Sequence, residues 1–175
     1  MLDSFKIFDK SKFEDRRGNL TEIFKASYFQ KHLGKNINFV QDNLVESYQN
    51  SFRGLHYQIK PRSQGKYISV ISGEVFDVIV DIRKDSISFG SCYSFTLSSD
   101  NMKSLWVPPG FAHGFLTLSK KSIVLYKLTD FYCKESERSI KWNSKRLSIS
   151  WPNVKNFVLS EKDRNAKDFD SIEFD

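Results

Sequence analysis

From Tyr67 onward the chain alternates between short runs of β-branched and aromatic residues and groups of turn-forming residues. Short strands at this spacing are typical of an all-β sandwich or barrel. No repeat, low-complexity tract or linker interrupts the pattern, so we expect a single domain over residues 1–175. The predicted strands are Tyr67 to Ile71, Glu74 to Ile82, Ser91 to Leu97, Ser104 to Val107, Gly114 to Leu118 and Ser122 to Thr129.

The first half of the chain and its tail contribute a few further elements. A turn over residues 14–18 ends at Gly18, which suits a positive φ. A short helix is expected between Ser27, which could cap it, and Gly34, which could end it. The remaining predictions are strands at Leu20 to Phe24 and Ile37 to Asn43, the segment Phe52 to Gln58, and a short helix near Ser160 to Asn165.

The segment Phe52 to Gln58 carries the chemistry around which we expect the chain to be organised. Side chains alternate along a strand, so Arg53 and His56 face opposite sides unless a bulge at Gly54 redirects one of them. Glycine permits such a bulge, and bulges are common beside active sites. With a bulge, Arg53, His56 and the nearby Lys66 would converge on one anionic ligand.

The composition limits the kinds of molecule that the protein is expected to bind. The net charge of +6 is compatible with nucleic acid, with a small anionic ligand, or simply with solubility. Basic residues are spread along the chain with acidic residues between them, which argues against nucleic acid. No stretch resembles a signal peptide or approaches the ~20 apolar residues of a membrane helix, so we expect a cytoplasmic protein. Cys92 and Cys133 are expected to be free thiols.

A metal site has little support. The three histidines are His32, His56 and His113, and no His-x-His pair occurs. His32 lies in the predicted helix and is interpreted as a surface residue, which leaves two distant histidines. Two histidines supply too few ligands for a metal without several carboxylates. For His113 a purely structural role remains an equal alternative.

A series of motifs resembles the dTDP-4-dehydrorhamnose 3,5-epimerase family, in order and at matching spacing from about Phe13 to Asp163. The resemblance implies a cupin-type jelly-roll barrel that works as a homodimer without metal or cofactor and exchanges its N-terminal strand with its partner. The matching motifs are Asp15 to Gly18, Phe39 to Asn43, Arg53 to Gln58, Gln64 to Lys66, Gly73 to Val78, Val80 to Arg83, Pro109 to Phe115 and Trp151-Pro152.

The resemblance also implies a reaction and its catalytic residues. The substrate would be a nucleotide-linked 4-keto-6-deoxyhexose, whose ketone acidifies the protons on C3 and C5. His56 matches the base and Asp163 its carboxylate partner, while Lys66 matches the residue beside the ketone oxygen. Tyr126 matches the proton donor, although the strand pattern alone favours an inward-facing core aromatic at that position.

The substrate-binding positions follow by the same resemblance. Arg17 and Arg53 match residues that bind the two phosphates, and Tyr132 matches the aromatic ring that stacks on thymine. Because the N-terminal strand is exchanged in the family, Arg17 and Glu22 are expected to serve the neighbouring subunit. The remaining matched contacts are Gln41, Asp42, Asn43, His113, Glu137 and Lys162.

The sequence departs from the family pattern at four places, one of which, Ser86-Ile87-Ser88 in place of the usual Ser-Pro-Thr, is interpreted as a turn change without consequence. Asn19 replaces a usual phenylalanine, Ser144 stands where an aspartate is usual after Trp142-Asn143, and the tail after Asp163 matches poorly. Asn19 puts the preference for base or sugar in question. Alternatives that stay open are an epimerase of C3 alone, an epimerase of another keto sugar, and a sugar-nucleotide-binding cupin without turnover.

Overall fold

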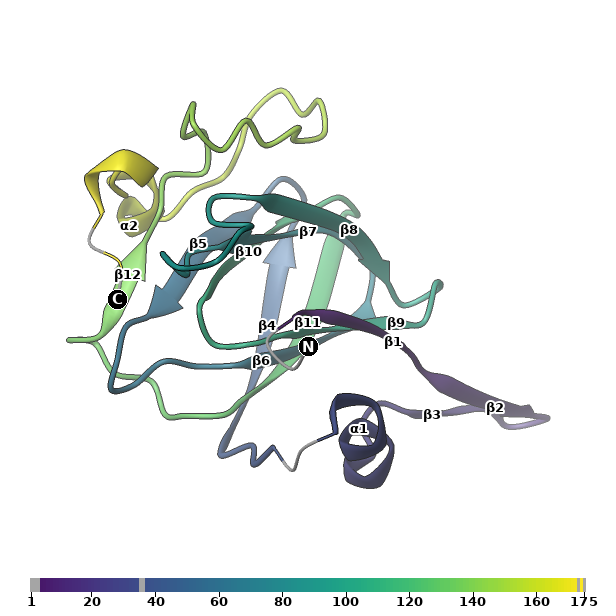
Figure 1. The fold of residues 1–175 in the computed structure, drawn as a ribbon. Coiled ribbons are helices and arrows are strands. Elements are labelled where there is room, and N and C mark those ends of the chain that lie inside the picture. The colour runs from purple at the N-terminus through teal and green to yellow at the C-terminus, as the bar shows by residue number, and fades with distance from the viewer. Residues whose placement is uncertain (1–3, 35–36, 173, 175) are drawn as a thin grey trace.

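The computed structural model describes residues 4–34, 37–172 and 174, and these form a barrel of two antiparallel sheets that face each other (Figure 1). The first sheet has the strand order β1-β9-β6-β11-β4, and the second has the order β12-β5-β10-β7-β8. Their bounds are β1 Lys6–Asp9, β4 Gln41–Tyr48, β5 Phe52–Gln58, β6 Lys66–Ser72, β7 Glu74–Asp81, β8 Cys92–Ser98, β9 Lys103–Val107, β10 Phe111–Thr117, β11 Lys121–Leu128 and β12 Glu137–Ser139. The prediction of an all-β fold is confirmed.

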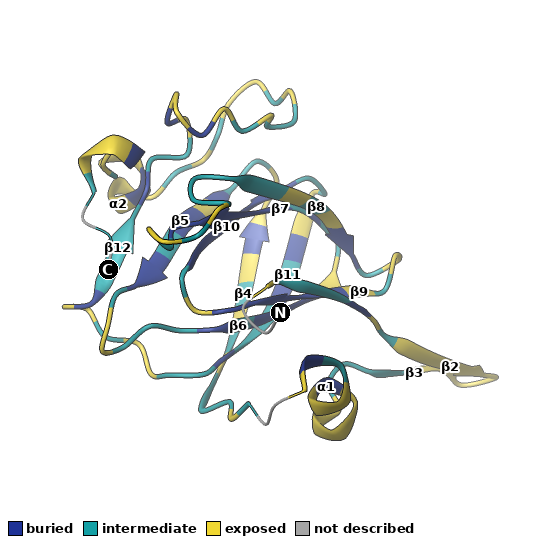
Figure 2. Ribbon diagram, in the orientation of Figure 1, coloured by how far each residue is buried: buried dark blue, intermediate teal, exposed yellow. Residues whose placement is uncertain are grey.

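The elements outside the two sheets are few. Strands β2 (Ser11–Asp15) and β3 (Gly18–Glu22) form a separate hairpin, which projects from the barrel and is mostly exposed (Figures 1 and 2). The helices are α1 (Ala26–Leu33), α2 (Glu161–Arg164) and the 3-10 turn η1 (Phe169–Ser171). No helix within the described ranges is long and apolar enough to cross a membrane. Cys92 and Cys133 are both free thiols.

The hydrophobic residues gather on three sides of the sheets. The main core fills the space between the sheets and includes Ile68, Leu105, Val75 and Phe115. A second cluster lies on the outer face of the β5-β10-β7 layer, which the segment 140–174 covers with residues such as Phe169. Both faces of this layer are therefore buried, which explains why β10 is buried along its whole length.

The third cluster corrects two of the sequence predictions. The predicted strand at Ile37 to Asn43 begins only at Gln41, because Ile37 and Phe39 pack instead against the aromatic residues under α1. Helix α1 is capped at Lys25 without a side-chain hydrogen bond, so the prediction that Ser27 caps it is wrong. Burial of Phe29 and Leu33 in this cluster sets where the helix begins, while Gly34 ends it at φ 68° as predicted.

A bulge in β5 places Arg53 and His56 on the same face of the sheet. His56 lies opposite His113 of β10, but Arg53 lies opposite Phe115, so three steps along β5 match two along β10. Gly54 has φ +148°, and a Cβ there would lie 2.5 Å from the Cα of Gly114. Only glycine accepts both that backbone conformation and that close approach. The bulge that the sequence suggested is thus present, and it is fixed by two glycines.

The glycine contact predicts a large loss of stability for Gly54→Ala. The methyl group would overlap the β10 backbone at a positive φ, and we expect the free energy of unfolding to fall by about 2–4 kcal/mol. Gly18→Ala is the matched control, since Gly18 also has a positive φ but nothing lies within 4 Å of the position that its methyl group would take. Its cost is expected to be about 1 kcal/mol. Denaturant unfolding of both variants measures the difference, and equal losses would contradict the role assigned to the contact.

Candidate active site

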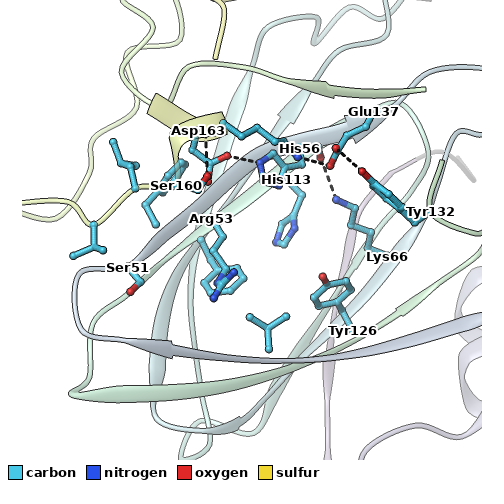
Figure 3. Close-up of a pocket in the computed structure, with 16 residues that line it drawn as sticks. Ser51, Arg53, His56, Lys66, His113, Tyr126, Tyr132, Glu137, Ser160 and Asp163 are labelled. Carbon is cyan, nitrogen blue, oxygen red and sulfur yellow. Dashed lines mark hydrogen bonds and ion pairs between the residues drawn. The ribbon is translucent and has the colours of Figure 1, made fainter. Parts of the chain in front are cut away.

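A cavity of about 480 Å³ opens between the two sheets and collects most of the residues singled out from the sequence. Figure 3 shows His56 and Tyr126 on opposite sides of it, with Lys66 reaching in beside them. His56 comes from β5 in one sheet and Tyr126 from β11 in the other, so the fold itself separates them across the cavity. The predicted residues that line it are Arg53, His56, Lys66, His113, Tyr126, Tyr132, Glu137, Lys162 and Asp163.

His56 is paired with a buried carboxylate. Its Nε2 lies 2.5 Å from Oδ1 of Asp163, whose side chain is only 3% exposed. Burial lowers the pKa of His56 below its usual 6.5, although hydrogen bonding and charge from Asp163 oppose the shift. Burial alone would raise the pKa of Asp163, but the interactions with His56, Ser160 and Lys162 together outweigh it and the pKa falls. The pair thus supplies a neutral, oriented imidazole at neutral pH, which suits a general base.

A one-turn helix delivers Asp163 to this pair. Ser160 caps α2, and its hydroxyl accepts a hydrogen bond from the Asp163 backbone N–H at 3.1 Å. The sequence predicted a short helix here, and the cap explains why it begins at Glu161. Ser160 also lines the cavity but was not among the predicted site residues.

Lys66 is enclosed in the cavity wall. Its Nζ donates a hydrogen bond to the backbone oxygen of His56 at 3.1 Å. Burial lowers its pKa from 10.5 to about 8, against the attraction of Asp77 and Glu137. At neutral pH the ammonium is therefore still charged, but it holds its proton weakly. A desolvated cation of this kind is suited to stabilise an oxyanion.

His113 forms a second histidine–carboxylate pair deeper in the cavity. Its Nε2 lies 2.9 Å from Oδ2 of Asp77, which is fully buried. Oδ1 of Asp77 has no hydrogen-bond partner among the described residues. Asp77 was missed as a site residue, although an acidic residue inside the apolar run of β7 is itself a signal, because buried charges need partners.

Arg53 is held in place at the cavity wall by strand β4 of the opposite sheet. Its Nε donates to the hydroxyl of Ser47 at 2.8 Å, and its Nη2 donates to the backbone oxygen of Glu46 at 3.1 Å. Ser47 is 2% exposed, so its position is fixed by packing. A guanidinium oriented in this way at the mouth of a cavity is suited to bind phosphate oxygens.

Polar side chains line the rim of the cavity and are hydrogen-bonded to one another. Glu137 accepts hydrogen bonds from the hydroxyl of Tyr132 at 3.0 Å and from Nζ of Lys162 at 2.5 Å. A smaller depression beside the cavity is lined by Gln41 and Asn43, and the side chain of Gln41 donates to that of Asn43 at 3.0 Å. The backbone N–H of Tyr132 also donates to the side-chain oxygen of Gln41 at 3.1 Å, so β4, β12 and α2 form one polar edge.

Three predicted binding residues lie away from this cavity. Alternation along β4 turns Asp42 to the outer face, where both carboxylate oxygens lie 2.8 Å from Nζ of Lys127. Arg17 lies in the β2–β3 hairpin, 90% exposed at its side chain and 2.6 Å from Asp15. Glu22 ends β3, with Lys25 3.6 Å away. The roles of all three stay predictions.

No group of three or more His, Cys, Asp or Glu residues within the described ranges is arranged to hold a metal ion. The side chains that line the cavity supply acid–base chemistry of their own. A base and a phenol lie across the cavity from each other, with a buried ammonium beside them. This arrangement can remove a proton from one face of a bound molecule, stabilise the resulting anion, and return a proton to the other face.

The shifted pKa of Lys66 can be measured directly. NMR titration of the lysine side chains should show Lys66 with a midpoint of about 8. Asp77→Asn removes a charge that raises this pKa, so the midpoint should fall further. Asp42→Asn, on the outer face of β4, is the control and should leave the midpoint in place. A midpoint unchanged by Asp77→Asn would show that the two groups are not coupled.

Known proteins resemble this chain along nearly its whole length. The family model described as dTDP-4-dehydrorhamnose 3,5-epimerase matches residues 1–171. The dTDP-4-dehydrorhamnose 3,5-epimerase of Shigella flexneri is 46% identical over 163 residues, which cover 93% of this chain and 90% of that protein.

Solved structures extend this similarity to the fold. The crystal structure of dTDP-6-deoxy-D-glucose-3,5-epimerase from Legionella pneumophila, in complex with dTDP-4-keto-L-rhamnose, has a TM-score of 0.93 and 44% identity, covering 97% of this chain and 89% of that one. A 3'-monoepimerase from Streptomyces bikiniensis, in complex with dTDP-quinovose, has a TM-score of 0.89 and 27% identity, covering 94% and 83%. The fold is the cupin-type jelly roll that the resemblance to the family implied. On the strength of the family match and these identities, the chain belongs to the dTDP-4-dehydrorhamnose 3,5-epimerase family.

Proposed function

We propose that this protein is a dTDP-4-dehydrorhamnose 3,5-epimerase, which converts dTDP-4-dehydro-6-deoxyglucose to dTDP-4-dehydrorhamnose by inverting C3 and C5. The observation that carries the proposal is the His56–Asp163 pair, which faces Tyr126 across a cavity large enough for a sugar ring. Similarity to enzymes that act on this class of substrate supports the choice of sugar.

Proton removal begins at His56. The C4 ketone makes the protons on C3 and C5 acidic, and the neutral Nε2 or Nδ1 of an imidazole can accept one of them. The Nε2 of His56 is engaged by Asp163, which leaves Nδ1 to face the substrate. The imidazolium that forms is stabilised by the adjacent carboxylate, and the carboxylate also holds the ring in one orientation.

The electrons released at carbon move to the C4 oxygen and form an enolate. The ammonium of Lys66 is proposed to lie beside that oxygen and to stabilise its charge. Tyr126 then donates its phenolic proton to the carbon from the opposite face, which inverts the configuration. The imidazolium then releases its proton to solvent and the phenolate takes one up, which resets both residues. The same steps at the second carbon complete the double epimerisation.

The nucleotide part of the substrate is proposed to bind at the rim of the cavity. Arg53 is proposed to bind a phosphate, because Ser47 and Glu46 already fix its guanidinium there. Tyr132 is 55% exposed, so one face of its ring is free to stack on a thymine base. Gln41, Asn43, His113, Glu137 and Lys162 are proposed to contact the rest of the substrate, and Asp42 by resemblance alone.

A second copy of the chain is proposed to complete the site. The β2–β3 hairpin projects away from the cavity of its own chain, which puts Arg17 and Glu22 out of reach of it (Figure 1). Phe13 and Leu20 pair across the hairpin and are 61% and 64% exposed, an apolar surface that a neighbouring subunit could cover. The homodimer would thus bring Arg17 and Glu22 to the partner's cavity.

Deuterium exchange tests the reaction. Incubation with dTDP-4-keto-6-deoxyglucose in heavy water should place deuterium at both C3 and C5, as read by NMR. His56→Ala should lower the exchange rate by about 10²- to 10⁴-fold, the usual contribution of a general base. His32→Ala is the matched control, because this histidine lies on α1 outside the cavity, and its rate should be unchanged. Label at C3 alone would identify a mono-epimerase, and no label would favour a binding protein or another sugar.

Mixing two inactive variants tests the exchanged hairpin. In a heterodimer of His56→Ala and Arg17→Ala subunits, one site would carry both changes and the other neither. Random mixing should therefore restore about a quarter of wild-type activity, since half of the dimers are mixed and each has one intact site. Mixing His56→Ala with Lys66→Ala gives no intact site and is the control. Recovery no higher than in that control would place Arg17 in its own subunit's site or outside any site.

A further inference from the structure

The chain after α2 is hydrogen-bonded to the loop that follows β12. Ile140 and Lys167 form a parallel bridge, and the N–H of Lys141 donates to the oxygen of Lys167 at 2.8 Å. Two residues further along, the side chain of Phe169 is 1% exposed in the cluster that covers the β5-β10-β7 layer. The tail is therefore a packed part of the fold.

The same loop is also hydrogen-bonded to the strand that carries His56. Ser139 of β12 lies opposite His56, and Ile140 exchanges backbone hydrogen bonds with Leu55 at 2.9 and 3.2 Å. One short segment thus pairs with β5 on one side and with the tail on the other. It therefore connects the strand of His56 to the chain that follows the helix of Asp163.

Ser144 makes the side-chain link between this loop and the tail. Its hydroxyl donates to Oδ1 of Asp168 at 2.6 Å and accepts the N–H of Phe169 at 3.3 Å. Ser144 is 3% exposed, so water does not compete for these hydrogen bonds. This serine is also one of the positions at which the sequence departs from the family pattern.

Helix α2 needs such support, because it has a single turn. A helix of four residues is not stable by itself. Besides the Lys162–Glu137 contact, its position therefore depends on what holds the chain on each side of it. On the N-terminal side, Val158 is hydrogen-bonded to Phe52 and to Asn50. On the C-terminal side, the contacts of Ser144 and Lys141 with the tail are the corresponding attachment.

We propose that Ser144 and Asp168 are positioning residues that hold Asp163 against His56. They touch neither the cavity nor the reacting atoms, and they act by fixing the segment that follows α2. The proposal rests on the proposed epimerisation, in which the His56–Asp163 pair is the base. It assigns a role to the tail, for which the resemblance to the family gave none.

The central test is a double-mutant cycle on the deuterium-exchange reaction. Ser144→Ala should lower kcat about tenfold and leave KM within about twofold, because only the geometry of the base is disturbed. In the Asp163→Asn background the same substitution should change kcat by less than about twofold, since there is no longer a carboxylate pair to position.

Two further variants separate positioning from loss of stability. Asp168→Ala should reproduce the effect of Ser144→Ala, whereas Asp168→Asn keeps an oxygen that accepts the serine hydroxyl and should restore kcat to within about threefold of wild type. Ser98→Ala is the matched control, because Ser98 is also a buried serine, at 4% exposure, and its hydroxyl accepts two backbone N–H groups. Ser98 does not line the cavity, so its variant should lose stability and keep its kcat.

The outcomes distinguish this proposal from the proposed function. Absence of exchange in the wild-type protein would overturn the epimerisation itself. Exchange in the wild type with an unchanged kcat in Ser144→Ala, or an equal loss in both backgrounds, would overturn the positioning role alone. If Ser144→Ala does not fold, the comparison of Asp168→Ala with Asp168→Asn decides, and equal kcat values for that pair would overturn it.

Discussion

The contact between the backbones of Gly54 and Gly114 is the constraint on which the cavity depends. Strand β5 can approach β10 this closely only where neither residue has a side chain, and the bulge in β5 lies at that point. Regular alternation would turn either Arg53 or His56 toward the buried cluster on the other face of the sheet. Because of the bulge, both side chains face the cavity. Arg53, the candidate phosphate-binding residue, and His56, the candidate base, therefore lie in the same site.

Burial then sets the charge states of the two central groups. It disfavours the charged form of both His56 and Lys66, and lowers both pKa values. The consequence differs because the two groups start from different reference values, near 6.5 and 10.5. The same physical effect makes the imidazole neutral at neutral pH and leaves the ammonium charged. A single enclosed cavity therefore provides an acceptor for protons and a cation for an oxyanion.

Much of the barrel could be predicted from the sequence, because its strands are short and bounded by turn residues. Most of the residues proposed for the site line one cavity, and their roles there stay predictions. The errors lie where tertiary packing outweighs local preference. Ile37 and Phe39 are apolar enough for a strand, but they pack under α1, and no local signal reveals that cluster. Residues that orient the side chain of another residue were also missed, because such contacts join positions that are brought together only by the fold. The sequence holds no signal for Ser47, which orients Arg53 from the opposite sheet. Asp77 does give a signal, because it is an acidic residue flanked by apolar residues within β7.

The site is assembled from segments that the barrel core alone does not fix. Asp163 is separated from His56 by 107 positions in the chain, and it arrives on a single helical turn near the C-terminus. Arg17, if the hairpin is exchanged as proposed, arrives from another subunit. Segments that bury few side chains, such as α2 and the β2–β3 hairpin, open at a lower free-energy cost than the sheets do. Within α2 only Asp163 is buried, whereas the tail after it packs Phe169 into the cluster on the β5-β10-β7 layer. Under the proposed positioning role, a change confined to the Ser144–Asp168 hydrogen bond would displace the carboxylate while Phe169 keeps the tail on the barrel.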